Sequence, residues 1–163
     1  MAKYIVFSDS HGKNDLMYDI IRQNKAEIDG IFHLGDIERA EEELSLMIQG
    51  PVYIVKGNCD TYSSLKNEHV FQLHGHKVAM THGNRYHVGM GVDLLKYWAL
   101  ENQADLVLYG HTHVPFVEQS SQMTILNPGS ISRPRQGDGK CSYAWLEFLP
   151  NGEISVEIIK VEK

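Results

Sequence analysis

Apolar and polar positions divide the first half of the chain into short runs that alternate between strand and helix. Three apolar runs are typical of buried strands, at residues 3–7, 31–34 and 52–55. Apolar residues at helical spacing predict a helix after Asn14 or Asp15 and a second, Glu-rich helix over 37–48. Strands that alternate with helices indicate parallel pairing through right-handed crossovers.

The second half of the chain is richer in strands. Two apolar runs flank His74-Gly75-His76 and predict a hairpin over 70–81, and a helix is expected near 92–102. Further strand-like runs follow at 106–109, 116–118, 124–126, 143–148 and 154–161. This layout predicts a layered α/β sandwich with helices outside. We expect a parallel-leaning sheet from the first half of the chain and a more antiparallel sheet from the second.

Length and composition describe one globular domain. The chain has 163 residues, of which 42% are hydrophobic and 22% charged, and this average composition excludes a disordered chain. Its apolar runs are far too short to span a membrane. Two cysteines make no disulfide framework, and the first residues lack the layout of a signal peptide. We therefore expect a cytoplasmic protein with a single domain over residues 1–163.

Charge limits the partners of this chain. Its 15 Lys and Arg residues against 21 Asp and Glu residues give a net charge of −6 and a pI of about 5.8. That balance argues against a protein that holds nucleic acid by neutralising phosphates. The sequence has nine histidines, and histidine is the commonest metal ligand in proteins. The positions of these histidines therefore bear on the chemistry.

Side chains that bind metals follow the predicted strands at their carboxyl ends, where open α/β sheets bind ligands. Seven residues share this placement: Asp9, His11, Asp36, Asn58, His82, His111 and His113. Imidazole suits zinc, iron and nickel, whereas carboxylate and amide oxygens suit manganese and magnesium. Seven ligands are too many for one tetrahedral zinc but enough for two ions that share a carboxylate. Asp36, central in the order, is the natural bridge.

Each of these signals also has an ordinary structural explanation when it stands alone. Asp9 and His11 could belong to a turn with an Asx cap, and Asp36 could be only the N-cap of the Glu-rich helix. His111 and His113, in contrast, share one face of an extended segment, as ligands must. Together the seven residues favour metal binding.

The seven residues lie in five short motifs whose order resembles the calcineurin-like metallophosphoesterase family: Asp9-X-His11, Gly35-Asp36, Gly57-Asn58, His82-Gly83 and Gly110-His111-Thr112-His113. Two further features make the chain most similar to the small bacterial and archaeal phosphodiesterase branch of the YfcE or YsnB type. These are the Gly57-Asn58-Cys59-Asp60 sequence and the Asn127-Pro128-Gly129-Ser130 turn. The resemblance implies a four-layer α/β/β/α sandwich, in which two packed mixed β-sheets are flanked by helices.

The resemblance also implies an activity, which is metal-dependent hydrolysis of a small phosphodiester by a hydroxide held between two divalent ions. Manganese is the expected metal, with zinc, nickel or iron as alternatives. The first ion would take Asp9, His11, Asp36 and His113, and the second would take Asp36, Asn58, His82 and His111. Asp36, Asn58 and His82 are the expected catalytic residues among these ligands.

Four further residues are candidates for a supporting role or for substrate contact. Cys59 stands where many members of the wider family carry histidine, and a thiol is a weak donor, so we expect little general-acid assistance from it. Asp60 is expected to orient its own loop or a ligand histidine. Arg85 and Arg133 could contact the substrate or lie in solvent.

Two other functions compete with the phosphodiesterase interpretation. The retromer scaffold subunit shares the family's fold and binds partner proteins with an impaired metal centre, whereas this chain keeps all seven ligands. A nuclease is the other alternative, and the acidic charge balance argues against recognition of duplex nucleic acid. The edge of the last predicted hairpin, over 143–161, could pair with a second copy of the chain.

Overall fold

A computed structural model describes residues 1–162, and its strands form two five-stranded sheets. In the first sheet the strand order is β10 (Ile154–Val161), β9 (Cys141–Phe148), β1 (Ala2–Phe7), β2 (Gly30–His33) and β3 (Val52–Ile54). In the second sheet it is β4 (Glu68–Leu73), β5 (His76–Thr81), β6 (Leu106–Leu108), β8 (Thr124–Pro128) and β7 (Pro115–Gln119). The helices are α1 (Asp15–Asn24), α2 (Glu41–Leu46) and α3 (Asp93–Glu101), with short 3₁₀ helices at Asn84–Tyr86 and Val88–Met90.

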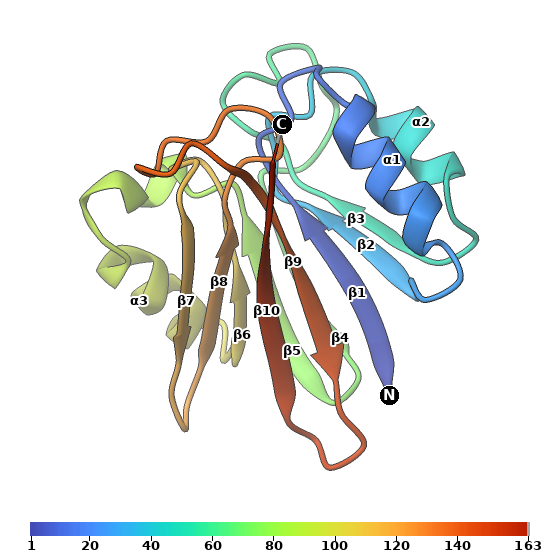
Figure 1. Ribbon diagram of the computed structural model, residues 1–163. Coiled ribbons are helices and arrows are strands. Elements are labelled where there is room, and N and C mark those ends of the chain that lie inside the picture. Colours follow the sequence, from blue (N-terminus) through green and yellow to red (C-terminus); the bar gives the residue numbers. More distant parts are fainter. Residues whose placement is uncertain (163) are drawn as a thin grey trace.

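Alternation along the strands produces the layers (Figure 1). In β1, Ile5 and Phe7 pack in a core shared with α1 and α2, whereas Tyr4 and Val6 belong to the core between the two sheets. A third core lies between the second sheet and α3, where Trp98 is buried. The predicted four-layer α/β/β/α sandwich is therefore confirmed.

Both sheets are mixed, and this corrects the expected division of the chain into halves. Strands β1, β2 and β3 are parallel, as predicted, but β9 pairs antiparallel with β1, so the C-terminal hairpin completes the first sheet. The second sheet contains a parallel trio, β5, β6 and β8, between antiparallel edges. The apolar pattern of β9 indicates a strand buried on both faces but does not say which strand it pairs with.

The Glu-rich helix is shorter than the predicted range of 37–48. Helix α2 covers only Glu41–Leu46, because the backbone before it has left-handed conformations at Glu38 (φ 55°) and Arg39 (φ 72°). The backbone N–H of Glu38 donates to Asp60 Oδ1 at 2.7 Å, so a contact with another loop replaces the first helical turn. Asp36 is therefore no N-cap, since the helix begins five residues after it.

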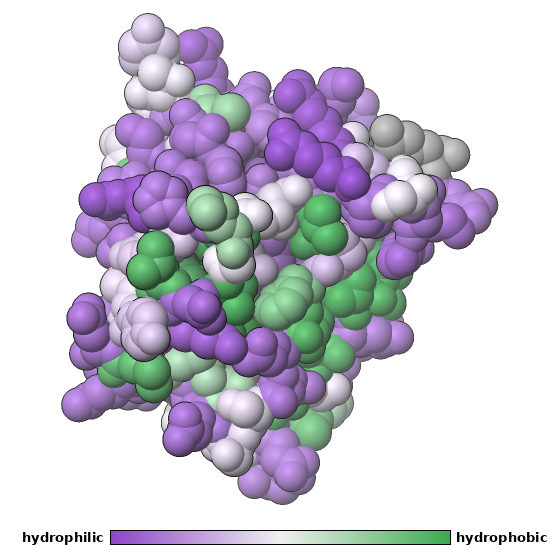
Figure 2. Space-filling view, turned by 90° about the vertical axis from the view of Figure 1, so that its left-hand side faces the viewer, coloured by the Kyte–Doolittle hydropathy of each residue, from purple (hydrophilic) through white to green (hydrophobic). Residues whose placement is uncertain are grey.

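Polar atoms cover much of the face that carries α3 and β7, with apolar side chains exposed among them (Figure 2). The exposed apolar side chains of these two elements include Leu94, Tyr97, Phe116 and Val117. Across residues 1–162, the structure contains no helix with the length and apolar character needed to cross a membrane.

The carboxyl ends of β1, β2, β5 and β6 lie at the same end of the sandwich, at the top of Figure 1. Loops from the two sheets approach one another closely there. A Cβ atom added to Gly110, which follows β6, would lie 2.0 Å from Ser8 Oγ and 2.8 Å from Asp9 Oδ2, on the loop after β1. Only a residue without a side chain allows this approach.

We predict that Gly110→Ala lowers the free energy of unfolding by about 1–3 kcal/mol, because the methyl group forces the two loops apart. Urea denaturation of the metal-free protein measures this change. Gly137→Ala is the matched control, since a Cβ atom there meets no atom within 4 Å. A Gly110→Ala protein as stable as the Gly137→Ala protein would contradict the prediction.

Candidate metal centre

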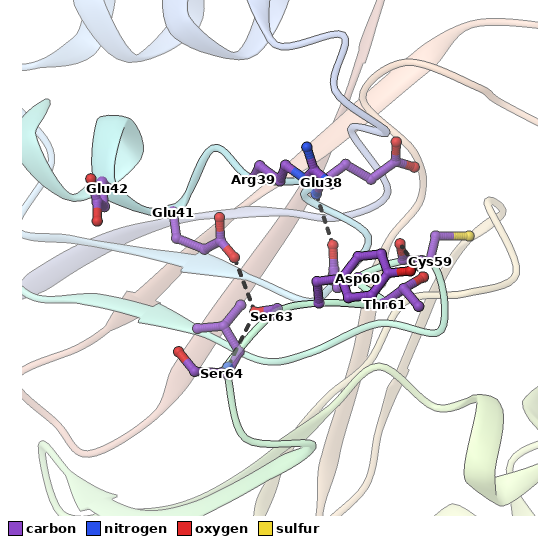
Figure 3. A pocket seen from close by; sticks show the side chains of 11 residues that line it. Glu38, Arg39, Glu41, Glu42, Cys59, Asp60, Thr61, Ser63 and Ser64 are labelled. Atoms are coloured by element: carbon purple, nitrogen blue, oxygen red, sulfur yellow. Dashed lines mark hydrogen bonds between the residues drawn. The ribbon is translucent and has the colours of Figure 1, made fainter.

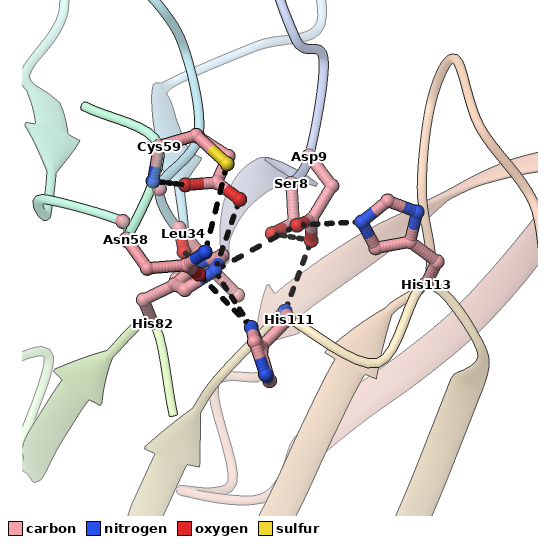
Figure 4. Close-up of polar contacts among 12 residues, drawn as sticks. Ser8, Asp9, Leu34, Asn58, Cys59, His82, His111 and His113 are labelled. Carbon is pink, nitrogen blue, oxygen red and sulfur yellow. Dashed lines mark hydrogen bonds and ion pairs between the residues drawn. The ribbon is translucent and has the colours of Figure 1, made fainter. Parts of the chain in front are cut away.

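The seven predicted ligands converge in one cluster. Figure 4 shows five of them, Asp9, Asn58, His82, His111 and His113. Asp9 Oδ1 lies 3.2 Å from His113 Nε2, and 3.8 Å from both His11 Nε2 and His82 Nε2. Two overlapping groups, Asp9 with His11 and His113, and Asp9 with Asp36 and His82, each place their ligand atoms within 4.8 Å of one another. Both sheets thus contribute to one cluster.

Five of the seven candidate ligands have a left-handed backbone conformation. Their φ angles lie between 49° and 69°, at Asp9, His11, Asp36, His111 and His113. Such conformations cost about 1 kcal/mol or more each for residues other than glycine, and they persist only where surrounding contacts impose them. Here the backbone N–H of Asp9 donates to Gly35 O at 3.1 Å, and that of His11 donates to Asp36 O at 2.8 Å. The backbone is strained where the side chains must converge.

Asp36 contacts residues assigned to both of the expected ions. Its Oδ2 lies 3.3 Å from His82 Nε2 and 3.6 Å from His11 Nε2, while its Oδ1 accepts the backbone N–H of Cys59 at 2.8 Å. One oxygen of this carboxylate therefore faces a histidine of each predicted ligand set, which is the placement that a bridging ligand requires.

Three of the histidines are oriented through their Nδ1 atoms. His82 Nδ1 lies 2.6 Å from Leu34 O, His113 Nδ1 lies 2.6 Å from Arg133 O, and His11 Nδ1 lies 2.8 Å from Glu38 Oε1. Because carbonyl and carboxylate oxygens only accept, each Nδ1 carries the proton and donates it. In the neutral ring, Nε2 is then left with its lone pair directed toward the carboxylates, which is how metal-ligating histidines are held.

While its histidines are neutral, the centre lacks positive charge at its middle. Asp9 Oδ1 is buried without a hydrogen-bond partner, and His11 Nε2 lies 3.2 Å from His113 Nε2, so that two lone pairs face one another in the neutral tautomers. A divalent cation resolves both conflicts, and carboxylate oxygens with imidazole nitrogens form a suitable donor set. The residues present therefore fit divalent metal ions.

Electrostatics keep both carboxylates ionised. Burial would raise the pKa of Asp36, but His82 in its protonated form and the Cys59 N–H stabilise the charged carboxylate more strongly and hold its pKa well below the ordinary value. The pKa of Asp9 is lowered in the same way, against its burial, by His113 and His82. Two negative charges thus lie in the cluster at neutral pH, ready for a cation.

Asn58 and His111 complete the cluster on its more exposed side. Asn58 Oδ1 lies 3.1 Å from His111 Nδ1, which in turn lies 3.3 Å from His82 Nε2. The backbone N–H of His111 donates to Asp9 Oδ2 at 3.0 Å, so this loop is anchored on the first carboxylate. These contacts place both residues beside His82, as the second ligand set requires.

Asp60 organises loops rather than a histidine. Its carboxylate is buried and accepts three backbone N–H groups, from Asp36 at 2.8 Å, Glu38 at 2.7 Å and Gly57 at 2.8 Å. Of the two roles expected for it, the structure supports the first. It joins the loops after β2 and β3, which carry Asp36 and Asn58.

Cys59 lies at the edge of the centre as a protonated thiol. Its Sγ lies within 4.8 Å of ligand atoms of His11 and Asp36. Burial and the nearby Asp36 carboxylate raise its pKa to about 11. A thiol that holds its proton so firmly is a poor general acid, which agrees with the expectation from sequence.

The two arginine candidates have contacts other than with the ligands. The guanidinium of Arg85 lies 3.9 Å from Glu68 Oε1. Arg133 acts through its backbone carbonyl, which orients His113 as described. Contact of either side chain with a substrate stays a prediction. The roles of Glu38 and of the Leu34 carbonyl have no signal in the sequence, because a backbone acceptor has no residue preference and Glu38 resembles any residue of an acidic helix.

Comparison with known proteins agrees with this geometry. Residues 2–149 match the calcineurin-like phosphoesterase superfamily domain. This chain belongs to that family. It is 33% identical to the probable metallophosphoesterase YsnB of Bacillus subtilis (strain 168) over 131 residues, which are 80% of this chain and 76% of that protein. With phosphodiesterase YfcE of Escherichia coli (strain K12) the identity is 35% over 104 residues, 59% of this chain and 52% of that protein.

A solved structure has the same fold. The crystal structure of a predicted phosphoesterase from Streptococcus pneumoniae TIGR4 superimposes with a TM-score of 0.83 at 35% identity, covering 98% of this chain and 91% of that one. The predicted resemblance to the small YfcE/YsnB-type branch is therefore confirmed, as is phosphoesterase as the family's activity.

We predict that Glu38→Gln weakens metal binding about 10-fold or more, because the amide holds the Nδ1–H of His11 less firmly than the carboxylate does. Calorimetric titration of chelator-treated protein with Mn²⁺ measures the dissociation constant. Glu42→Gln is the control, since it removes a neighbouring carboxylate that lies outside the ligand cluster. Equal affinities in the two variants would contradict the role assigned to Glu38.

His33, the last residue of β2, is fully buried behind the site. Its Nδ1 accepts the Gly35 N–H at 3.3 Å, so its Nε2 carries the proton and donates to Ser10 Oγ at 3.1 Å. If Nδ1 were protonated, its N–H would face the Gly35 N–H, and neither group could accept a hydrogen bond from the other. Burial, the largest influence, lowers the pKa of His33 to about 3.

This histidine makes the fold sensitive to acid. Between about pH 3 and 6.5 the unfolded chain binds a proton at residue 33 that the folded protein does not, so the free energy of unfolding falls as the pH falls. We predict that His33→Gln reduces this slope by up to about 1.4 kcal/mol per pH unit. Urea denaturation at several pH values measures it, with exposed His87→Asn as control. An unchanged slope would contradict the prediction.

Proposed function

We propose that this protein is a metal-dependent phosphodiesterase that binds two divalent ions, with manganese as the first choice of metal. One observation carries the proposal: the buried Asp9 Oδ1 has no hydrogen-bond partner and faces three histidine Nε2 atoms at 3.2–3.8 Å. A cluster that leaves a buried carboxylate oxygen unsatisfied costs stability unless a cation binds there. All seven ligands expected for two ions lie in this cluster.

The seven candidate ligands form two sets, one for each ion. Asp9, His11 and His113 would hold one ion, Asn58, His82 and His111 the other, and Asp36 would bridge them. When bound, the ions supply a hydroxide nucleophile at neutral pH and neutralise charge that develops on the phosphoryl oxygens. The carbonyls of Leu34 and Arg133 and the carboxylate of Glu38 keep the three Nε2 atoms aimed inward. No side chain of the cluster is required as a general base.

A diester is favoured over a monoester as the substrate. The relative YfcE is named a phosphodiesterase. A diester carries less negative charge than a monoester, and the thiol of Cys59, with its pKa raised to about 11, gives a leaving alcohol little help. Small phosphodiesters with good leaving groups are therefore the proposed substrates. A cytoplasmic location is part of the same proposal.

We predict that chelator-stripped protein hydrolyses bis-p-nitrophenyl phosphate only after a divalent metal is restored, with p-nitrophenyl phosphate a poorer substrate. Manganese, zinc and nickel are added back separately, and release of p-nitrophenolate is measured. Asp36→Asn should lower kcat about 100-fold or more, because the amide cannot bridge two cations.

Asp19→Asn, on the exposed face of α1, is the matched control and should keep full activity. Loss of activity in both variants would point to unfolding, which circular dichroism detects. Folded protein without turnover under any metal would overturn the proposed function and favour the scaffold alternative.

A further inference from the structure

Figure 3 shows a cavity of about 730 Å³. Two chain segments supply its lining, residues 38, 39, 41 and 42 from one and residues 59–65 from the other. Its volume falls within the range of ordinary small-ligand sites. The cavity is distinct from the ligand cluster, since of the seven predicted ligands none lines it.

Two of the lining residues connect the cavity to the centre. Glu38 accepts a hydrogen bond from His11 Nδ1 at 2.8 Å, and the backbone N–H of Cys59 donates to Asp36 Oδ1 at 2.8 Å. The Cys59 Sγ lies within 4.8 Å of ligand atoms of His11 and Asp36. A phosphoryl group held at the centre therefore has one of its ester substituents within reach of this cavity.

The walls of the cavity are fixed to each other before any ligand binds. Asp60, from one segment, accepts the backbone N–H of Glu38, from the other, at 2.7 Å. Ser63 Oγ donates to Glu41 Oε1 at 3.0 Å across the same gap, as the dashed lines in Figure 3 show. A preformed cavity selects its ligand without an ordering cost, so its chemistry indicates what it binds.

The lining carries an excess of negative charge. It contains four carboxylates and one guanidinium: Glu38, Glu41, Glu42, Asp60 and Arg39. The remaining polar groups are the hydroxyls of Thr61, Tyr62, Ser63 and Ser64. The Tyr62 side chain is 90% exposed, so its ring is available to a ligand. Carboxylates beside an aromatic face attract ammonium groups and repel anions.

We propose that this cavity binds one ester substituent of the phosphodiester and selects a small alcohol that carries an ammonium group, of the choline or ethanolamine class. The inference rests on the proposed function, because it places the phosphoryl group at the metal centre. Glu42 and Tyr62 are the specificity-determining residues. Substituents with an additional negative charge, such as a second phosphate, are excluded by the acidic lining.

Three chromogenic substrates with the same leaving group test the inference. They are p-nitrophenylphosphorylcholine, its uncharged isostere p-nitrophenyl 3,3-dimethylbutyl phosphate, and p-nitrophenyl 2-carboxyethyl phosphate. For the metal-loaded protein we expect kcat/KM to be about 10-fold higher for the choline ester than for the uncharged isostere, and lowest for the carboxylate. The preference should shrink as the salt concentration rises.

Variants separate this inference from the proposed function. Glu42→Gln and Tyr62→Leu should each reduce, several-fold, the ratio of kcat/KM for the choline ester to kcat/KM for its uncharged isostere. Glu157→Gln, an exposed carboxylate on β10, is the matched control and should keep that ratio. Equal kcat/KM for the choline ester and its isostere, or a preference that both variants keep, would overturn the inference alone. Failure to hydrolyse any diester would overturn both proposals.

Discussion

Two buried carboxylates, Asp9 and Asp36, carry negative charges that the surrounding loops must compensate. The pKa of each is held low in spite of burial, because histidines from both sheets face them and can carry a balancing proton. Three of those histidines donate their Nδ1 protons elsewhere, so their Nε2 atoms add lone pairs rather than positive charge in the neutral ring. With neutral rings, only a cation at the middle satisfies the arrangement, and local strain of this kind is typical of functional sites.

Closely packed loops hold these mutually repelling side chains together. The two sheets bring their strand ends together, and close approaches at Gly57 and Gly110 leave no space for a Cβ atom. Five ligand residues adopt left-handed backbone conformations that neighbouring loops hold in place. Asp60 fastens the loops after β2 and β3 through three N–H groups. Hydrogen bonds thus compensate the backbone strain, and the same hydrogen bonds hold the loops that carry the candidate ligands in place.

The hydrogen bonds that Asp60 accepts also determine the shape of the surface beside the centre. Because Asp60 holds the Glu38 backbone out of helical geometry, α2 begins late and the segment 38–42 turns toward residues 59–65. The cavity between these segments and the orientation of His11 therefore depend on one carboxylate. The proposed metal centre and the proposed substituent site therefore share one short loop.

Local features follow from the sequence alone: the strands with their alternating apolar faces, the seven candidate ligands at strand ends, and the motif order that indicates the family. Those signals can be found because each depends on residues near one another in the chain. The remaining features depend on the folded chain. The pairing of β9 with β1, the late start of α2, the role of Glu38 and the carbonyls that orient His82 and His113 all arise between distant segments. Every residue has a backbone carbonyl, so the sequence does not show which carbonyl accepts a hydrogen bond. The apolar pattern of a strand shows that it is buried but not which strand it pairs with.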